Sequence, residues 1–367
     1  MRRIYLDNAA TTPLLPEVKE FLCKVLDVFG NPSSPHSIGE ESKELLEIAR
    51  ENVASLLNVD PVNLIFNSCA TEGNNTVILG LVDKREGGNL VISSIEHKSV
   101  SKPAHLLAKR GIEVREVRVD RNGVVDLEDL ERLIDDGTIL VSVMYVSNEF
   151  GTVQPVEEIA KICGERGVPF HTDAVQALGK VDLSLEGVSF ATFSGHKFHG
   201  PKGVGFMYAS DHIDPLIHGG GQERGVRSGT ENLPGILAMS KALEVIFESF
   251  EENVSRLKVL RDRFEEALLE ALPDAVIIGR DVRRSPAIST VIFPKFTGWD
   301  LVRRLSERGV MCSAGSACSS GEVLPNPHLL AMGYSPEEAT RAVRFSFGLL
   351  NTEEEVEEAV SIIRSLF

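Results

Sequence analysis

The sequence predicts a fold of the α/β class, in which a large, doubly wound and mostly parallel sheet domain is joined to a smaller α/β domain. From residue 63 onward, apolar segments typical of strands alternate with amphipathic segments typical of helices. Several apolar segments are nearly continuous, which indicates strands covered by helices on both faces of a parallel sheet. The length of 367 residues also favours one large domain with a second, smaller one.

The strands and helices of the large sheet follow one another along the first half of the chain. We expect strands at residues 89–94, 112–119, 138–146, 168–172 and 190–193. Helices are expected between them at residues 126–134 and 156–167, where apolar residues recur at helical spacing. Ligands of such sheets bind at the carboxyl ends of the strands. Because three of these strands end in polar residues, we expect those residues to meet at one edge of the sheet.

A change of pattern marks the predicted second domain. Glu, Lys, Arg and Leu at helical spacing predict one long helix over residues 236–272, and a short strand follows at residues 289–294. We place the domain boundary inside that long helix. The large domain is then residues 15–255, and the small domain is residues 1–14 together with residues 256–367.

Composition and charge exclude several classes of protein. The chain has 43% hydrophobic and 25% charged residues, as ordinary soluble globular proteins do. Its net charge of −16 argues against a surface for nucleic acid or for an anionic membrane. The N-terminus does not resemble a signal peptide, and no apolar run approaches the ~20 residues that span a bilayer. Five cysteines without CxxC spacing argue against a disulfide framework or a zinc site and predict a reducing, cytoplasmic location.

A lysine at the end of a predicted buried strand is the first candidate for chemistry. In "SFATFSGHKFHGPKGVG", residues 189–205, an apolar strand runs directly into Lys197, with Ser194 and His196 beside it. For a lone lysine, the commoner explanation is a stem on apolar surface with its head in water. A buried amine is costly unless it is used, however, and a buried lysine with a lowered pKa can form a Schiff base, most commonly with pyridoxal phosphate.

Pyridoxal phosphate makes further demands that the sequence can meet. Its pyridine nitrogen needs a carboxylate, and Asp173 stands at the end of a predicted strand. Its phosphate needs a helix N-terminus with small hydroxyl residues, and Thr71 in "SCATEGNN" opens an apolar helical segment. Both residues are also common N-caps, which is the ordinary alternative for each. His97 follows another strand and could stack on a flat ring, whereas Asn148 and Gln176 are by themselves ordinary loop residues.

Two other kinds of site compete for the same region. A nucleotide-binding P-loop would use the glycine spacing from Gly195 to Gly200, but Pro201 stands where that motif needs lysine. A metal-dependent hydrolase could draw nitrogen and oxygen ligands from a set of four side chains. That set is His171, Asp173, His196 and His199. It lacks a helical frame of the HExxH type, so the local pattern favours it less than the cofactor.

The second half of the chain adds a thiol and a guanidinium. Small residues surround Cys318 in "CSAGSACSSG", so we expect an exposed thiol, for which a nucleophilic or redox role is favoured over a tolerated surface cysteine. Cys312 instead follows apolar residues and is expected in the core. Arg344 alternates with apolar residues in "AVRFSFG", which predicts a strand that presents its guanidinium for bidentate capture of a carboxylate. A surface salt bridge is the alternative for Arg344.

Taken in order, these segments resemble those of the NifS/IscS-type cysteine desulfurases, which are pyridoxal-phosphate enzymes of fold type I. The resemblance extends over nearly the whole chain. The segments that carry it are "YLDNAATTP", "GNPSSPHS", "ATEGNN", "EHKSV", "VSNEFGTVQP", "HTDAVQALGK", "SGHKFHGPKGVG", "GGGQERGVRSGT", "GSACSSG" and "RFSFG". The cysteine-bearing segment is similar to that of the family members with the longer loop, rather than to the group with an RxGHHCA-like motif.

The resemblance implies a role for each matching residue. Lys197, Cys318 and His97 are the implied catalytic residues, with Lys197 carrying the cofactor and Cys318 accepting the sulfur. Asn148 and Arg344 are implied to receive the substrate carboxylate. The residues implied to hold the cofactor are Ala70, Thr71, Ser194 and His196 at the phosphate, His97 on the ring, Asp173 at the pyridine nitrogen, Gln176 at the phenolic oxygen, and Asn148, Lys197 and Thr230.

The implied activity is removal of sulfur from L-cysteine, which gives L-alanine and a persulfide on Cys318. The persulfide would pass to a sulfur acceptor, such as an iron–sulfur scaffold protein. Thr230 matches a residue that the family contributes from the neighbouring subunit, which implies a homodimer. No metal, nucleic acid or membrane is implied. A selenocysteine lyase or a transaminase is the alternative within the same cofactor class.

Two departures from the family pattern stand out. Cys69 lies in the phosphate loop, where many relatives have a smaller residue, so we expect local packing there to differ. The sequence given ends at Phe367, whereas members of the IscS type usually continue through a tail that helps to dock the iron–sulfur scaffold. The resemblance therefore does not carry that mode of docking over to this chain.

Overall fold

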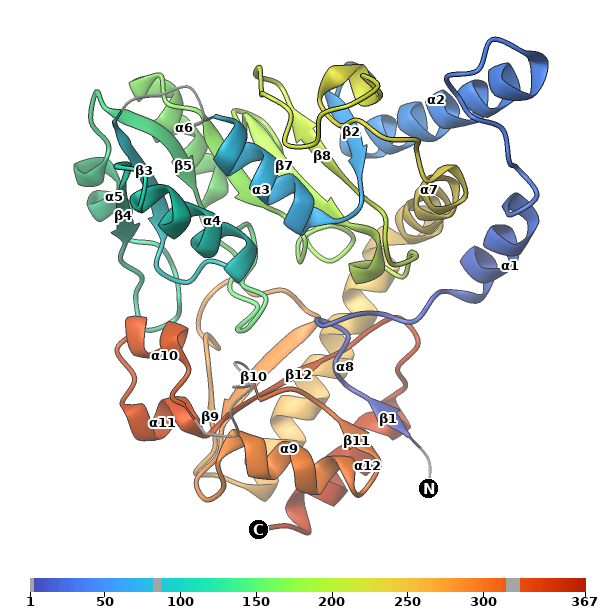
Figure 1. Cartoon of the computed structure of the whole chain (residues 1–367). Helices are drawn as coiled ribbons and strands as arrows, with labels where there is room; N and C mark the ends of the chain where they lie inside the picture. The colour runs from blue at the N-terminus through green and yellow to red at the C-terminus, as the bar shows by residue number, and fades with distance from the viewer. Residues whose placement is uncertain (1–2, 82–86, 315–323) are drawn as a thin grey trace.

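The computed structural model describes residues 3–81, 87–314 and 324–367. Two bodies make up the molecule, a larger one around a seven-stranded sheet and a smaller one around a three-stranded sheet (Figure 1). The first strand and the C-terminal helix both lie in the smaller body (Figure 1). Among these residues, no helix combines the length and the apolar character needed to cross a bilayer.

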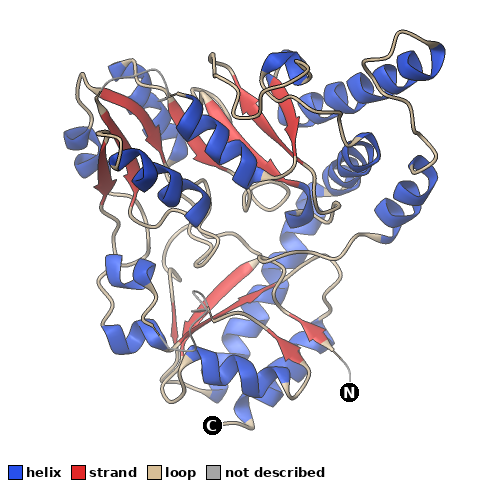
Figure 2. Ribbon diagram, in the orientation of Figure 1, coloured by secondary structure: helices blue, strands red, loops and turns tan. Residues whose placement is uncertain are grey.

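The sheet of the larger body is mostly parallel. Its strands are β2 (Leu64–Asn67), β3 (Asn89–Ser93), β4 (Glu113–Val117), β5 (Thr138–Ser142), β6 (Phe170–Asp173), β7 (Phe190–Ser194) and β8 (Gly205–Ala209). They follow the order β2-β8-β7-β6-β5-β3-β4. Strand β8 runs antiparallel to both of its neighbours, and the pairs from β7 to β4 are parallel. The predicted fold class, fold type I with a large doubly wound sheet, is confirmed (Figure 2).

Helices cover the large sheet on both faces. One face carries α1 (Pro16–Val25), α2 (Ser37–Leu57), α5 (Leu127–Leu133), α6 (Val156–Arg166) and α7 (Leu233–Glu248), and the other carries α3 (Ala70–Gly80) and α4 (Lys98–Ala108). Ile65 and Phe66 are neighbours in β2, yet they belong to the two different cores. Successive residues of a strand point to opposite faces, so each strand serves both layers of helices.

The smaller body has a core of its own. Its antiparallel sheet consists of β12 (Ala342–Ser346), β10 (Ile288–Ile292) and β9 (Val276–Ile277), and its helices are α8 (Phe250–Ala271), α9 (Gly298–Ser306), α10 (Pro327–Ala331), α11 (Pro336–Thr340) and α12 (Glu353–Arg364). The rings of Phe264 and Phe345 pack at 4.7 Å in this core. Strand β1 (Ile4–Tyr5) joins it by pairing in parallel with β11 (Val310–Met311). Short 3-10 turns complete the described structure at η1 (Pro61–Asn63), η2 (Gly195–Lys197) and η3 (Glu223–Gly225).

One predicted element is wrong. The long helix expected over residues 236–272 is two helices, α7 and α8, separated at Ser249, whose φ of −132° and ψ of 39° are not helical. The apolar pattern did not reveal the break because it continues across it, where the rings of Phe247 and Phe250 stack at 5.6 Å. The division into residues 15–255 and the rest, whose boundary falls within α8, stays a prediction.

Candidate active site

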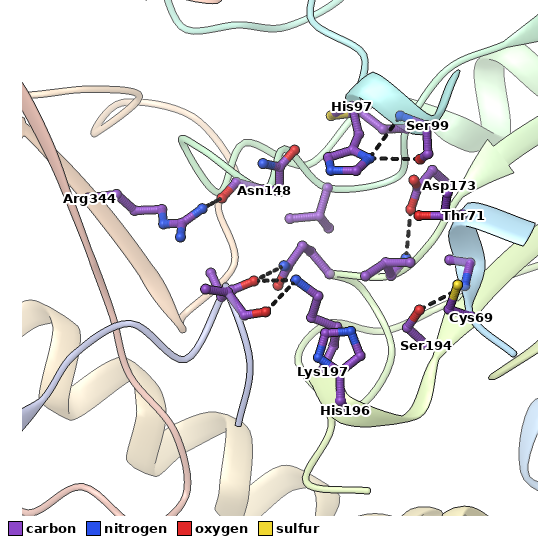
Figure 3. Close-up of a pocket in the computed structure, with 17 residues that line it drawn as sticks. Cys69, Thr71, His97, Ser99, Asn148, Asp173, Ser194, His196, Lys197 and Arg344 are labelled. Carbon is purple, nitrogen blue, oxygen red and sulfur yellow. Dashed lines mark hydrogen bonds between the residues drawn. The ribbon is translucent and has the colours of Figure 1, made fainter. Parts of the chain in front are cut away.

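A cavity of about 380 Å³ lies at the edge of the large sheet where it faces the smaller body. Figure 3 shows the side chains that converge on it from both bodies. Most of the residues predicted from the sequence line this cavity. They are Ala70, Thr71, His97, Asn148, Asp173, Gln176, Ser194, His196, Lys197 and Arg344.

The strand ends explain why these residues meet. Asp173 is the last residue of β6 and Ser194 the last residue of β7. Strand β5 ends at Ser142, earlier than expected, but the chain stays aligned beyond it, because the N–H of Val143 donates to His171 O at 3.1 Å and that of Tyr145 to Asp173 O at 2.9 Å. The backbone ladder therefore guides the segment that leads to the cavity, as strand-end placement predicts.

Lys197 projects into the cavity from the 3-10 turn that follows β7. Its Nζ donates hydrogen bonds to the carbonyl oxygens of Ala9 at 2.7 Å and Ala10 at 2.9 Å. Burial first, and then the positive charge of Arg344, lower the pKa of Lys197 to about 8, against the opposing negative charges of Asp173 and Asp7. Roughly a tenth of the amine is therefore uncharged at pH 7 and available as a nucleophile or proton acceptor, far more than for an ordinary lysine.

A hydrogen-bond network centred on Asn74 connects two sides of the cavity. The Nδ2 of Asn74 donates to Asp173 Oδ2 and to Ser99 Oγ, both at 2.8 Å. Its Oδ1 accepts a hydrogen bond from Thr192 Oγ1 at 2.5 Å, which fixes the orientation of the amide. Ser99 in turn lies 2.7 Å from the Nδ1 of His97. The carboxylate and the imidazole are thus held by one buried amide.

The His97 ring stays exposed toward the cavity while its Nδ1 is engaged. The backbone N–H of Ser99 donates to that nitrogen at 3.1 Å, so the proton of the neutral ring resides on Nε2. Loss of water around the ring lowers the pKa of His97, an effect that the negative charge of Asp173 opposes. The ring is therefore a neutral, oriented surface at pH 7 and is suited to stacking on a flat ligand.

The N-terminus of α3 opens into the cavity. Cys69 is the N-cap of this 11-residue helix and makes no side-chain capping bond, and the N–H of Ala70 donates to Ser194 Oγ at 2.8 Å. The exposed Thr71 adds a hydroxyl, and the pKa of His196 is lowered to about 4, chiefly by burial and then by Lys197. Backbone N–H groups at a helix N-terminus, with hydroxyl side chains beside them, form a suitable site for a phosphate.

Arg344 reaches the cavity from β12 of the smaller body. It is buried, and its Nη1 donates to Asn148 O and its Nη2 to Asp7 Oδ1, both at 2.8 Å. Its Nε and the Oδ1 of Asn148 are both buried without a hydrogen-bond partner in the described structure. Because unpaired buried polar groups are costly, these two atoms indicate a place where a polar ligand binds.

Two predicted site residues are not in this cavity. Thr230 is exposed and lines a separate hollow of about 70 Å³ near Arg227 and Glu231. Cys318 falls outside the residues that the structure describes. Cys312, which was predicted to be a core residue, is buried beside β11, and burial raises the pKa of its thiol.

The rival set of metal ligands is divided among separate contacts. The Nδ1 of the fully buried His171 lies 2.8 Å from Ser142 Oγ, and the Nδ1 of His199 lies 2.8 Å from the carbonyl oxygen of Pro13. Over residues 3–81, 87–314 and 324–367, no three His, Cys, Asp or Glu side chains are grouped so that they could hold a metal ion. The geometry therefore favours the cofactor interpretation over the metal interpretation.

Several important contacts were not predicted from the sequence. Asn74 had no assigned role, and neither did Asp7 or the carbonyl groups of Ala9 and Ala10 that accept from Lys197. All four lie inside segments whose motifs were noticed, "ATEGNN" and "YLDNAATTP". The motifs were the available signal, but which atoms meet depends on contacts between distant parts of the chain.

The chain is similar to known proteins over nearly its full length. The family model described as "Aminotransferase class-V" matches residues 4–359. This chain belongs to the class-V aminotransferase family. The protein named "Cysteine desulfurase IscS" from Dictyoglomus turgidum is 39% identical over 372 residues, which cover 100% of this chain and 94% of that protein.

Solved structures agree with this assignment. A structure described as "NifS-like protein" superposes with a TM-score of 0.93 at 39% identity and covers 99% of both chains. A second, described as "SspA in complex with cysteine", has a TM-score of 0.82 at 33% identity and covers 94% of this chain and 98% of its own. The predicted resemblance to the NifS/IscS-type proteins is confirmed.

Proteins of this family depend on pyridoxal phosphate, and the cavity fits that cofactor. It combines a partly buried lysine amine, a carboxylate oriented by Asn74, and the open N-terminus of α3. These are the groups that a pyridoxal aldehyde, a pyridine nitrogen and a phosphate require. The cofactor predicted from Lys197 is thereby confirmed.

Proposed function

We propose that this chain is a pyridoxal-phosphate-dependent cysteine desulfurase, which converts L-cysteine to L-alanine and transfers the sulfur atom to Cys318. The observation that carries the proposal is that the Lys197 amine, the Asp173 carboxylate and the Arg344 guanidinium line a single cavity. Similarity to a protein named cysteine desulfurase, and to a structure that holds cysteine, supports the choice of substrate.

The residues of the larger body would hold the cofactor. Lys197 would bind it covalently, His97 would stack on its ring, and Asp173 would face the pyridine nitrogen. Ala70, Thr71, Ser194 and His196 would surround the phosphate, and Gln176 and Asn148 would complete the polar contacts to the ring. When bound, pyridoxal phosphate supplies an electron sink for the bonds that break next to the α-carbon of an amino acid.

Arg344 and Asn148 would orient the substrate at the border between the two bodies. The unpartnered Nε–H of Arg344 offers a charge-assisted hydrogen bond to the α-carboxylate of L-cysteine. Lys197 would then take up the α-proton and return a proton to the product, because its pKa of about 8 suits both steps near neutral pH.

The sulfur transfer balances with a single acceptor thiol. The thiolate of Cys318 would attack the sulfur of the substrate, an S–S bond would form, and the C–S bond would break with its electron pair staying on carbon. A proton completes L-alanine, and Cys318 carries a persulfide. Cys318 follows Ser313 by five residues, so chain length alone keeps their Cα atoms within about 18 Å of each other. The Ser313 backbone is paired with that of Arg344, through N···O distances of 3.0 and 2.7 Å.

The persulfide would be passed to an acceptor protein, and iron–sulfur cluster assembly is the pathway that we favour, since the relative is named IscS. We also propose a homodimer, in which the exposed Thr230 would reach the phosphate of the neighbouring subunit. The cysteine content favours a cytoplasmic location.

Product analysis with L-cysteine tests this function. Protein loaded with pyridoxal phosphate should form L-alanine from L-cysteine and, in the presence of a thiol reductant, an equal amount of sulfide. Lys197→Ala should lower the rate by at least roughly a thousandfold, the range expected when a proton-transfer residue is removed. Lys202→Ala is the matched control, because Lys202 lies on the same segment but is exposed, and it should retain the wild-type rate.

Two outcomes would replace the proposal. If L-cysteine yields a keto acid and no L-alanine, the chain is a transaminase. If only L-selenocysteine is converted, it is a selenocysteine lyase.

A further inference from the structure

Lys180 is a buried lysine that the proposed reaction does not use. It follows β6 in the turn that also carries Gln176, and its side chain does not line the cavity. Within the described residues, its ammonium makes one hydrogen bond, to Gln176 Oε1 at 2.9 Å, and pairs with no carboxylate. A buried amine with a neutral partner is costly, so its presence needs an explanation beyond packing.

The contact with Lys180 determines which way the Gln176 amide points. With Oε1 accepting from Lys180, the Nε2 of Gln176 is left to donate to Ala9 O at 2.9 Å. A flipped amide would set its oxygen against the carbonyl oxygen of Ala9, which is repulsive, and would set its NH2 group against an amine that has no acceptor when it is charged. Nε2 carries a second hydrogen, and Gln176 lines the cavity, so one N–H remains for a ligand.

The same carbonyl oxygen links Gln176 to Lys197. Ala9 O accepts from Gln176 Nε2 at 2.9 Å and from Lys197 Nζ at 2.7 Å. A chain of contacts therefore runs from Lys180 through Gln176 and Ala9 to the amine that would bind the cofactor. Because the members of such a chain are all buried or half-buried, the orientation of one donor is transmitted to the next.

We propose that Lys180 is a positioning residue that locks the Gln176 amide with an N–H facing the cavity, where it meets the phenolic oxygen of pyridoxal phosphate. The inference rests on the proposed function, since it requires the cofactor on Lys197. The Gln176 N–H would donate a hydrogen bond to that oxygen. The oxygen would then hold less strongly the proton on the linked Lys197 nitrogen. Lys180 thus lowers the pH at which this proton leaves.

A neutral amine can perform this role. Burial first, and then the positive charges of Lys197 and Arg344, lower the pKa of Lys180 to about 7. Above that pH the amine has no charge but keeps N–H donors for Gln176. The ionisable and charged groups that affect Lys180 or Lys197 from the surrounding elements are Asp7, Asp173, His196, His199 and Arg344. They are present in every variant below, so differences between variants isolate Lys180.

The test is a pH titration of the visible absorption of the cofactor-loaded protein. Lys180→Met keeps the stem but removes the donor, and we expect the midpoint of the visible transition to rise by roughly 0.5–1 pH unit, as loss of one hydrogen bond implies. Lys180→Gln keeps a neutral donor for Gln176 and should stay near the wild-type midpoint. In a Gln176→Leu background, Lys180→Met should add no further shift.

The possible results separate the two proposals. If wild-type protein develops no visible band with pyridoxal phosphate, the proposed function itself fails. If the band forms and Lys180→Met leaves the midpoint unchanged, the positioning role is wrong. It is also wrong if Lys180→Gln shifts the midpoint as far as Lys180→Met does, or if the shift persists in the Gln176→Leu background. Should Lys180→Met fail to fold, Lys180→Gln compared with Gln176→Leu decides, since only the second should raise the midpoint.

Discussion

The two sides of the cavity differ in how completely their polar groups are paired. On the side of the large sheet, Asn74 satisfies Asp173 and Ser99 at once, and Ser194 accepts from the N–H of Ala70. At the border with the smaller body, the Nε of Arg344 from β12 and the Oδ1 of Asn148 from the larger body are buried and unpaired.

This difference in pairing matches how long each proposed ligand stays bound, the cofactor for many reaction cycles and the substrate for one. A cofactor that stays bound can be held by groups that are already oriented by their own neighbours, which is how a site is preorganised. A substrate that comes and goes needs donors that are free when it arrives. We therefore assign the sheet side to the cofactor and the Arg344 side to the carboxylate of L-cysteine.

Replacing Arg344 should impair the substrate side of the cavity and leave the cofactor side unchanged. Lysine cannot reproduce the two hydrogen bonds of a guanidinium fork, and losing one charge-assisted bond costs about 1.5–3 kcal/mol. Arg344→Lys should therefore weaken L-cysteine binding and lower kcat/KM by roughly ten- to a hundredfold, with the cofactor absorption unchanged. Cysteamine, which lacks the carboxylate, should bind poorly to both proteins and barely distinguish them.

The matched control is Arg341→Lys. Arg341 precedes β12 and pairs with the exposed Glu337, so its replacement should leave L-cysteine binding as it is. Unchanged cysteine affinity in Arg344→Lys would show that the guanidinium does not receive the carboxylate.

An effect on stability, rather than on substrate binding, tests the side of the large sheet. Glu96 lies beside His97 with its Oε1 bonded to Ser93 Oγ and to the N–H of Met144, and burial raises the pKa of Glu96 to about 8 from an ordinary value of 4.5. The folded protein then holds a proton that the unfolded chain releases. The stability gained is complete below pH 4.5 and is lost as the pH rises toward 8, at about 1.4 kcal/mol per pH unit.

Glu96→Gln removes this titration. Between pH 5 and pH 8, the window set by that raised pKa, the free energy of unfolding should fall less for the variant than for wild type, as urea titrations at several pH values would measure. Glu131→Gln, which changes an exposed carboxylate, should behave like wild type. Identical pH dependence in Glu96→Gln and wild type would mean that Glu96 is ionised when folded.

Much of the sheet side could be predicted from the sequence. Asp173, Ser194 and Lys197 each stand at or just after the end of an apolar strand, and parallel strands bring such ends together. Asn74 could not be assigned in this way, because its partners Ser99, Asp173 and Thr192 are brought to it from three other elements.

Other features escaped prediction for local reasons. Ser249 ends one helix and begins the next inside an unbroken apolar pattern. Serine followed three residues later by Glu252 is a helix-start signal, but the continuous helical spacing on both sides outweighed it in the prediction. The partner of Arg344 at Asp7 lies at the opposite end of the chain, where spacing carries no information. The motifs were thus sufficient to predict which residues form the site, whereas their hydrogen-bond partners could be found only from the fold.

The destination of the sulfur atom tests the central claim most directly. Protein loaded with pyridoxal phosphate is treated with L-cysteine without reductant, and its peptides are analysed by mass spectrometry. We predict one added sulfur atom on the peptide that contains Cys318, its loss in Cys318→Ala, and its retention in Cys23→Ala, which changes an exposed cysteine. Cofactor absorption should be the same in all three proteins. L-Alanine formation that continues undiminished in Cys318→Ala, or added sulfur on another cysteine in wild type, would contradict this prediction.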